Sequence, residues 1–488
     1  MGSSYQQFAR DVLIYGAATI FIQLGGIISM PVITKTLGAN DYGIWSQVQV
    51  TLSLAMILTL LGLTASMVRF LPAKTNKEEI QEDFYSVFCI IAAASLIISI
   101  FFLVFSNFIA SAFFGGATVV VRVTAIIILV SSLNTVCLNL FRSFQQVKRY
   151  SLFMVASSYG QIGLTVYLVI NGLGILSIVL AFLAIQLLQL FILLFMTRAQ
   201  IGISKPHFRR MKEYFNYALP TIPMSMASWV TTSSDRYVIA YFLGTTSVGI
   251  YSVAYGLGSI IFMPAGIVGF ILPAALFKFY DEGGVSEVKT HLSYSLKYLL
   301  ALAIPFVFGA SILAEPVLKL LSTAEIASEG YQVMPLIALG NLFLCATSVI
   351  CLILGLVKKM KIVGAIYVAA AVVNLGLNIL LVPYLGIIGA AIAMLITNSL
   401  ILGLTTYYSF QEFKFDIDWR FIIKSLVASA VMSLAVWLIY PRDSLATIIT
   451  AAIGAVVYGV VLLLLKGFKK EEFKFFRELI GIGKASSP

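Results

Sequence analysis

Charged residues are scarce in this chain. Asp, Glu, Lys and Arg make up 11% of its 488 residues, whereas hydrophobic residues make up 60%. A water-soluble domain carries roughly 25% charged residues. A chain with so few charges cannot cover a water-facing surface, which excludes a soluble globular protein.

Other absences narrow the class further. The sequence has no G-x-x-x-x-G-K-[ST] motif, so it does not hydrolyse a nucleotide through a phosphate-binding loop. Its two histidines, His207 and His291, fall between apolar runs, which excludes a histidine relay inside a membrane. All four cysteines fall within apolar runs, as is typical of small buried hydrophobic residues and not of a disulfide set. No residue is predicted to be catalytic, and the chain is not expected to be an enzyme.

What the sequence has in abundance is apolar runs, each long enough at about 20 residues to cross the hydrocarbon core of a bilayer. This pattern predicts an all-α integral membrane protein. Fourteen transmembrane helices are expected, at residues 12–33, 44–68, 84–105, 118–140, 150–170, 174–196, 214–242, 250–276, 293–314, 330–356, 362–382, 387–408, 421–440 and 445–465.

Two short motifs occur twice at nearly the same offset. The decapeptide at 37–46, Leu-Gly-Ala-Asn-Asp-Tyr-Gly-Ile-Trp-Ser, matches that at 243–252, Leu-Gly-Thr-Thr-Ser-Val-Gly-Ile-Tyr-Ser, in five positions at an offset of 206. Leu-Gly-Ile at 173–175 returns at 385–387, at an offset of 212. The echoes predict a duplicated six-helix unit. Because six is even, the seventh helix enters the membrane in the same direction as the first, so the repeats are expected to be parallel.

The duplication predicts the organisation of the whole chain. An N-lobe of six helices is expected at 1–196, a basic linker at 197–213, a C-lobe of six helices at 214–409, two extra helices at 410–466 and an amphipathic tail at 467–488. Two interpretations of the linker stay open. It is either a solvated loop that sets orientation or a segment that binds anionic lipid headgroups.

The positions of Lys and Arg support this helix count. With both termini in the cytoplasm, cytoplasmic segments hold 27 of the 32 basic residues, as the positive-inside rule requires. The expected location is a plasma or inner membrane, crossed many times.

Asp235 and Arg236 lie inside the seventh expected helix. A charge at the bilayer centre costs about 2.5–3.5 kcal/mol on insertion scales and usually marks a functional path. Neighbours at i and i+1 point in different directions around a helix, so we expect no simple salt bridge between the two, and each needs its own partner. Alternatively, Arg236 extends its side chain to the outer interface.

Asn374 and Asn378 are the expected partners of Asp235. They are spaced i,i+4 on the eleventh helix, share one face, and lie at a depth that matches Asp235. A carboxylate and two amide oxygens would suit a hard cation such as Na⁺, and would equally suit a proton-binding carboxylate. The alternative is that both asparagines are ordinary hydrogen-bonding contacts between helices. No other metal site and no organic cofactor is expected.

Arg69, Arg142 and Lys297 end or begin helices on the cytoplasmic side. With Arg236, they are the candidate substrate-binding residues. Turned inward, they would form a cationic mouth able to hold a phosphate or pyrophosphate. Topology alone also explains their positions.

These motifs resemble those of the multidrug/oligosaccharidyl-lipid/polysaccharide (MOP) exporter superfamily, in its polysaccharide transporter branch of Wzx-type flippases. The resemblance rests on Leu37-Gly38 before Tyr42-Gly43, on Phe141 with Gln145 or Gln146, and on Asn374, Asn378, Pro383, Gly386 and Gly389-Ala390-Ala391. One departure is Ala39-Asn40, where the family often has a proline after the glycine.

The resemblance implies transfer of a polyprenyl- or dolichyl-(pyro)phosphate-linked oligosaccharide from the inner to the outer leaflet. Some relatives bind Na⁺ among helices 7, 11 and 12, and in this sequence Asp235 lies on helix 7 while Asn374 and Asn378 lie on helix 11. A multidrug or cation antiporter of the same superfamily is the second hypothesis, and a membrane-embedded glycosyl enzyme is a distant third. The expected partners are the lipid-linked substrate, membrane lipids and polysaccharide assembly proteins, without nucleic acid, and the chain is expected to be a monomer.

Overall fold

The structure is a computed structural model that describes residues 2–441, 443–468 and 472. Of the predicted tail at 467–488, only Gly467, Phe468 and Glu472 belong to this described part of the chain. The described residues form helices and connecting segments, with no strand among them.

The helices divide into two compact units. Of the described residues, those within 1–253, 321–329 and 361–397 form unit 1, and those within 254–320, 330–360 and 398–488 form unit 2. The helices of unit 1 are α1 (Gly2–Leu60), α2 (Leu63–Phe70), η1 (Leu71–Ala73), α3 (Lys77–Val104), α4 (Ser106–Phe113), α5 (Thr118–Ser143), α6 (Val147–Ile170), α7 (Gly174–Ile201), η2 (Phe208–Arg210), α8 (Met211–Ala218), η3 (Leu219–Thr221), α9 (Ile222–Leu243), most of α10 (Thr245–Gly258), most of α14 (Ala324–Gly330) and the first part of α17 (Met360–Glu412).

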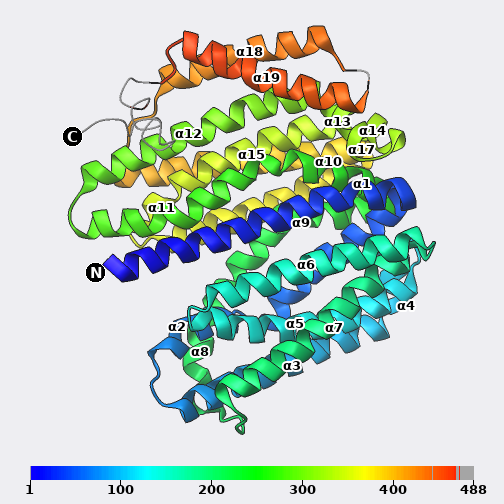
Figure 1. Cartoon of the computed structure of the whole chain (residues 1–488), viewed down its shortest axis with the longest axis vertical. Helices are drawn as coiled ribbons and strands as arrows, with labels where there is room; N and C mark the ends of the chain where they lie inside the picture. The colour runs from blue at the N-terminus through cyan, green and yellow to red at the C-terminus, as the bar shows by residue number, and fades with distance from the viewer. Residues whose placement is uncertain (1, 442, 469–471, 473–488) are drawn as a thin grey trace, which may run out of the picture. The chain divides into compact units, whose positions relative to one another are not determined.

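Unit 2 holds the remaining elements: η4 (Ile260–Phe262), α11 (Met263–Asp281), α12 (Val285–Ile312), most of α13 (Ala314–Leu321), α15 (Val333–Ile350), α16 (Leu352–Leu356), the second part of α17, α18 (Trp419–Ile439) and α19 (Ser444–Leu464). Within this unit, α18 and α19 lie side by side and α18 packs along α12 (Figure 1).

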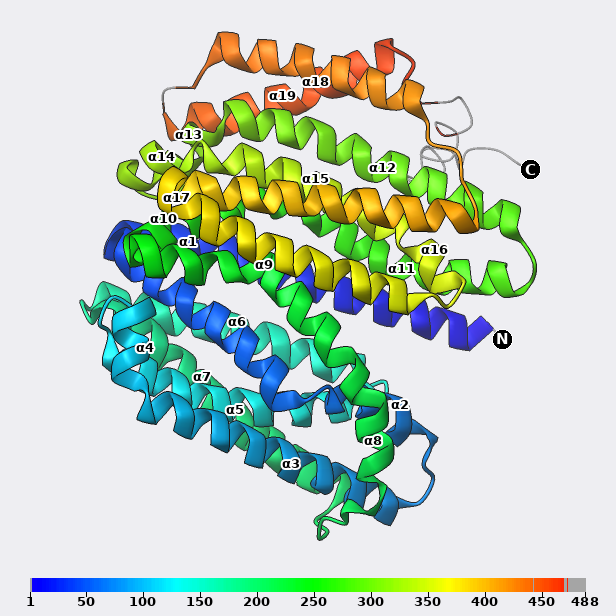
Figure 2. The ribbon, with the colours of Figure 1, turned by 180° about the vertical axis from the view of Figure 1, so that it is seen from behind.

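In unit 1, α3, α5, α6 and α7 form a bundle whose members run side by side (Figures 1 and 2). Its buried apolar centre includes Val121, Ile127 and Ile128 of α5 and Ile178 of α7. Polar side chains also join these helices. Asn134 of α5 donates from Nδ2 to the backbone oxygen of Gln186 on α7 at 2.9 Å. Such bonds are the expected contacts between helices that have no water around them.

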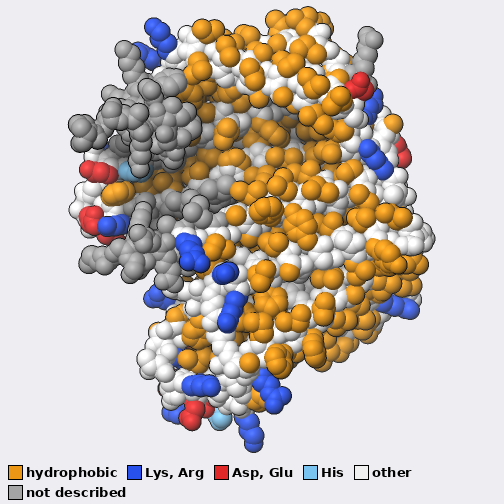
Figure 3. Space-filling model, in the orientation of Figure 1, with side chains coloured by type: hydrophobic (Ala, Val, Ile, Leu, Met, Phe, Trp, Pro, Cys, Tyr) orange, Lys and Arg blue, Asp and Glu red, His pale blue; other side chains and the backbone are white. Residues whose placement is uncertain are grey.

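Eleven of the described helical segments are long and apolar enough to cross a membrane. Their outer surfaces are apolar as well, with Phe191 and Phe195 of α7 more than 70% exposed. On the face in Figure 3, hydrophobic side chains cover most of the surface, whereas charged side chains are few and lie mainly near its margins. A protein with this surface belongs in lipid.

Two of the eleven are far longer than one crossing requires. The apolar part of α1 has 47 residues and α17 has 53, whereas about 20 residues span the bilayer core. Each is interrupted by a glycine in a backbone conformation that residues with a side chain rarely adopt: Gly38 has φ 79° and Gly386 has φ 61°. Both breaks fall between two spans that the sequence predicts.

The two sequence echoes have matching backbone conformations. Gly38 (φ 79°, ψ −175°) and Gly244 (φ 83°, ψ 176°) occupy the same position of the decapeptide, and both end a helical stretch. Gly174 and Gly386, from the second echo, both have φ 61°. The similarity of each sequence pair therefore extends to its local structure.

The two decapeptides also contact one another through residues 38–46 and 244–252, which we call the paired turns. Each consists of the glycine that interrupts the helix and the first helical turns that follow it. Ser46 and Ser252, which are equivalent residues, share a hydrogen bond of 2.6 Å between their hydroxyl oxygens. A methyl group built on Gly43 would overlap the carbonyl oxygen of Thr245, and one built on Gly249 would overlap that of Ala39. The contact is therefore reciprocal, with equivalent residues in equivalent roles.

Candidate functional site

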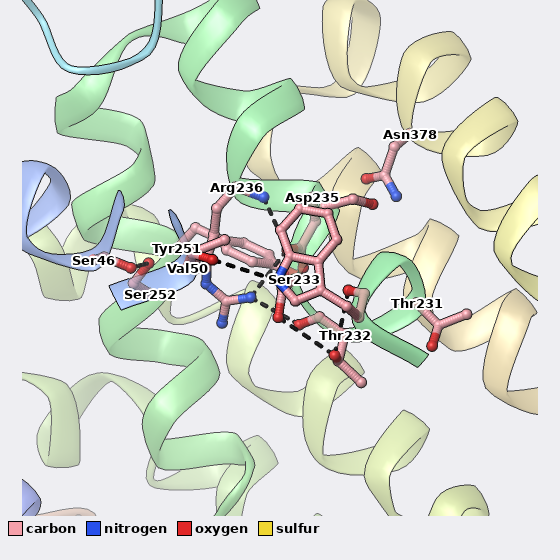
Figure 4. Close-up of polar contacts among 12 residues, drawn as sticks. Ser46, Val50, Thr231, Thr232, Ser233, Asp235, Arg236, Tyr251, Ser252 and Asn378 are labelled. Carbon is pink, nitrogen blue, oxygen red and sulfur yellow. Dashed lines mark hydrogen bonds and ion pairs between the residues drawn. The ribbon is translucent and has the colours of Figure 1, made fainter. Parts of the chain in front are cut away.

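The candidate site is built on α9, the helix that carries the charged pair. Asp235 and Arg236 are buried, with 4% and 6% of their surfaces exposed. Oδ1 of Asp235 accepts hydrogen bonds from the backbone N–H of Arg236 at 2.8 Å and from its Nη1 at 3.0 Å. Nη1 of Arg236 also donates to the carbonyl oxygen of Thr232, one turn earlier, at 2.9 Å. Figure 4 shows these groups close together.

The expectation that Asp235 and Arg236 do not pair is wrong, because they form a buried ion pair at 3.0 Å. The i,i+1 rule describes where two Cβ atoms point and holds for short side chains. An arginine side chain has enough rotatable bonds to turn back along its own helix and meet the carboxylate. Extension of Arg236 to the membrane interface is excluded for the same reason.

Tyr251 of α10 completes the group, and the sequence did not single it out. Its side chain is fully buried, and its hydroxyl donates to Oδ2 of Asp235 at 2.5 Å. Its ring centroid lies 5.6 Å from the guanidinium carbon of Arg236, within the range of a cation–π interaction. A signal was present, because Tyr251 is the counterpart of Trp45 in the second decapeptide.

Helix α1 fixes the position of α9 through two further contacts. Nε2 of Gln47 donates to the backbone oxygen of Arg236 at 3.3 Å, and the hydroxyl groups of Thr51 and Tyr237 lie 2.6 Å apart. Gln47 and Thr51 are fully buried. These contacts hold the segment of α9 that carries the charged pair. They limit how far the pair can move while α1 and α9 stay packed.

Asn374 and Asn378 belong to α17, and they form a polar chain that reaches α9. Nδ2 of Asn378 donates to Oδ1 of Asn374 at 3.1 Å, and Nδ2 of Asn374 donates to the hydroxyl of Thr397 at 3.2 Å. The hydroxyl of Ser234, next to Asp235, lies 3.5 Å from Oδ1 of Asn374. Figure 4 shows the amide end of Asn378 turned toward α9.

One oxygen of this hydrogen-bonded group of α17 lacks a partner within the described part of the chain. Oδ1 of Asn378 is buried and has no hydrogen-bond partner among the residues that the structure describes. A buried acceptor without a donor costs about 1–3 kcal/mol, so it is expected to have a ligand in the working protein. Amide, hydroxyl and carboxylate oxygens are hard ligands that fit Na⁺. Asn374, Asn378 and Asp235 thus carry the oxygen types that the predicted cation site requires, and in this structure both carboxylate oxygens of Asp235 are engaged by Arg236 and Tyr251.

The remaining predicted substrate-binding residues differ in environment. Arg69 and Arg142 are exposed in the last turns of α2 and α5 in unit 1, as a helix-end cation requires. Lys297 belongs to α12 in unit 2 and is only 5% exposed. Its Nζ lies 3.0 Å from Oε2 of Glu472 and 3.3 Å from Oδ2 of Asp418. Its charge is thus paired with two carboxylates in this structure.

Comparison with known structures shows which fold this is. The Lipid II flippase MurJ in an inward closed conformation superposes with a TM-score of 0.76 at 17% identity, over 96% of this chain and all of that one. An inward-facing multidrug resistance MATE transporter of the MOP superfamily gives a TM-score of 0.68 at 16% identity, over 83% of this chain and 97% of that one. The chain is a multi-pass helical membrane protein with the fold of the MOP superfamily.

A family model described as "Polysaccharide biosynthesis protein" matches residues 32–328, more than half of the chain. The chain belongs to that family.

Curated relatives are consistent with this membership. The chain is 24% identical to the "Succinoglycan biosynthesis transport protein ExoT" of Rhizobium meliloti, over 94% of this chain and 92% of that protein. It is 22% identical to the "Probable low-salt glycan biosynthesis flippase Agl15" of Haloferax volcanii, over 59% of this chain. It is 28% identical to the "Probable flippase AglR" of the same organism, over 36% of this chain. The matched regions span 61% and 36% of these two flippases, under two thirds of each.

Proposed function

We propose that this protein is a flippase that moves an oligosaccharide linked to a polyprenyl or dolichyl (pyro)phosphate from the cytoplasmic to the outer leaflet of a plasma or inner membrane. The head group passes through the protein by alternating access while the lipid tail stays in the bilayer. The observation that carries the proposal is the buried group Asp235–Arg236–Tyr251, inside a chain whose family is defined by polysaccharide biosynthesis. A charged pair in a membrane helix is costly and marks a transport path.

The proposed architecture is two parallel six-helix repeats followed by two helices, fourteen in all. The breaks at Gly38 and Gly386 support it, because each divides one long helix into two of spanning length. Helix α9 supports it too, since its 22 residues are enough to cross the bilayer core. It is not among the eleven described segments that are long and apolar enough to cross, because it contains a polar stretch. The reciprocal contact of the paired turns supports the duplication. Both termini are proposed to be cytoplasmic and the protein to be a monomer.

The proposed roles of individual residues follow from their chemistry. Arg69, Arg142 and Arg236 are proposed to attract the phosphate of the carrier lipid, since the planar guanidinium matches it. Asp235, Asn374 and Asn378 are proposed to bind a coupling cation, Na⁺ or a proton, through carboxylate and amide oxygens.

Reconstituted vesicles test the function directly. The purified chain is incorporated into liposomes that contain an undecaprenyl pyrophosphate-linked disaccharide, and a membrane-impermeant glycosidase outside measures how fast the inner-leaflet pool becomes accessible. We expect acceleration over empty liposomes, and loss of most of it in Asp235→Asn and Arg236→Gln. The matched control is Arg122→Gln, which removes one exposed arginine of α5. A rate equal to that of empty liposomes would refute the flippase proposal.

A multidrug or cation antiporter is the second candidate, favoured by the similarity to the MATE fold. The same vesicles distinguish it. An antiporter would move a cationic dye such as ethidium in exchange for sodium ions or protons that flow down their gradient. It would leave the lipid-linked sugar in its original leaflet.

A further inference from the structure

Asp235 already has a cation in this structure, namely Arg236. Its Oδ1 is engaged by the N–H and Nη1 of Arg236, at 2.8 and 3.0 Å, and its Oδ2 is engaged by the Tyr251 hydroxyl at 2.5 Å. A metal ion that binds this carboxylate must therefore displace at least one of these donors. Tyr251 is neutral, whereas the guanidinium repels an incoming cation, so Arg236 is the group that has to leave.

The oxygens that would receive such an ion lie on α17. Oδ1 of Asn378 is buried without a hydrogen-bond partner in the described part of the chain, and Oδ1 of Asn374 is 3.5 Å from the hydroxyl of Ser234, the neighbour of Asp235. Oδ1 of Asn378 can accept a cation where it lies, whereas Oδ1 of Asn374 already accepts from Nδ2 of Asn378 at 3.1 Å. Both of these residues are neutral, so the main electrostatic obstacle to a cation is on α9, where the guanidinium of Arg236 is paired with Asp235.

We propose that Arg236 is a tethered counter-ion that holds Asp235 until a sodium ion takes its place, and that the displaced guanidinium then becomes the anion-binding group of the site. This inference deepens the proposed function and rests on its cation site. In this structure the charges of Asp235 and Arg236 cancel. With sodium on Asp235 the site carries one net positive charge, in a buried environment that disfavours unpaired charge. A phosphate or pyrophosphate group restores the balance.

The exchange couples two ligands without any contact between them. Sodium binding frees Arg236 for the anion, and an anion that holds Arg236 frees Asp235 for sodium. Coupling between binding sites is reciprocal, so each ligand must raise the affinity for the other by the same factor. Arginine suits this role because its planar fork pairs equally well with a carboxylate and with a phosphate.

The test measures sodium affinity of the full chain in nanodiscs. Sodium chloride is titrated at constant ionic strength against choline chloride, with the shift in melting temperature and the heat of binding as readouts. Arg236→Gln should raise sodium affinity about tenfold, within the range of measured couplings between sites. Arg236→Lys should stay close to the wild type, and Asp235→Asn should abolish sodium binding. Arg122→Gln, which removes an exposed arginine, should leave the affinity unchanged.

Inorganic pyrophosphate is the probe for the second half of the proposal. It should raise the sodium affinity of the wild type and leave that of Arg236→Gln unchanged. Equal or weaker sodium affinity in Arg236→Gln overturns the counter-ion role, and an undiminished pyrophosphate effect in that variant overturns the anion-binding role. If Arg236→Gln does not fold, Tyr251→Phe replaces it. That variant frees Oδ2 and should raise sodium affinity by a smaller factor, and a fall would overturn the proposal.

The vesicle assay separates this inference from the proposed function. A wild type that translocates the lipid-linked disaccharide but binds no sodium overturns the counter-ion exchange and leaves the flippase standing. A protein that binds sodium with the expected coupling but translocates nothing supports the exchange and refutes the flippase.

Discussion

A carboxylate buried in a membrane helix loses its water contacts and must receive hydrogen bonds from the protein. Asp235 receives three, two from Arg236 and one from Tyr251. The donors come from α9 itself and from α10, two helices separated only by Gly244. The geometry of this group therefore depends on how the paired turns pack in unit 1.

Tyr251→Phe tests how much the hydroxyl contributes. The ring stays in place, so the cation–π contact with Arg236 is kept and only the bond to Oδ2 is lost. A buried acceptor without its donor costs about 1–3 kcal/mol, and the melting temperature in sodium-free choline chloride should fall accordingly. The exposed Tyr167 gives the control: Tyr167→Phe should change nothing. If Tyr251→Phe is equally silent, the hydroxyl is not what orients Asp235.

Lys297 makes a second residue-scale prediction. Its Nζ lies 3.0 Å from Glu472, which is itself 4% exposed, and 4.9 Å from the ring centroid of Phe421. Removing one partner of a buried pair typically costs about 3–5 kcal/mol, because the other charge is left uncompensated. Lys297→Gln should therefore lower the melting temperature strongly, and adding Glu472→Gln should restore part of the loss.

Lys319 is the matched control for Lys297. It forms an ion pair with Glu315 on a helix surface, and both side chains are substantially exposed. Lys319→Gln should give no measurable change in melting temperature, since exposed ion pairs contribute little. Equal effects of the two substitutions would show that Lys297 acts only as a surface charge.

At the scale of elements, the paired turns depend on two glycines. The backbones at Gly43 and Gly249 approach the opposite turn so closely that neither position has room for a side chain. Either Gly43→Ala or Gly249→Ala should therefore separate the turns and lower the melting temperature, and the reciprocal geometry predicts losses of similar size. Gly26→Ala on α1 has no neighbouring atom within 4 Å of the added carbon. It should be neutral or stabilising by up to about 1 kcal/mol, because alanine favours a helix.

The basic linker predicted at 197–213 is held in place by contacts with α3. The hydroxyl of Tyr85 on α3 donates to the carbonyl oxygen of Gly202 at 2.7 Å, and the N–H of His207 donates to Oγ of Ser86 at 2.9 Å. Arg210 adds an ion pair with Glu79 at 2.9 Å. The acids at the start of α3 thus neutralise part of the basic charge that the sequence places in this linker.

At the scale of the whole molecule, the sequence predicted what depends on composition and repetition. Apolar runs identified a helical membrane protein, and the echo at offset 206 identified the two segments that the structure places in contact. Long-range partners were harder. Asp235 and Arg236 were expected to need separate partners, because sequence spacing describes Cβ directions and not how far an arginine side chain can turn back. Tyr251 and Glu472 could not be assigned as partners, since they depend on how separate helices pack.

Alternating access makes a prediction that involves the whole chain. In the proposed alternating-access cycle, the two proposed repeats must separate at one membrane face in turn. The paired turns come one from each proposed repeat, and the hydroxyl oxygens of Ser46 and Ser252 in them are 2.6 Å apart. We expect Ser46→Cys with Ser252→Cys, in a background where the exposed Cys89 is serine, to form a disulfide on oxidation. Oxidised vesicles should then stop translocating the lipid-linked disaccharide and recover it on reduction, while either single cysteine stays active. Undiminished transport by the fully cross-linked protein would mean that these turns stay together throughout the cycle, and the substrate would then have to leave by a route that keeps this contact closed.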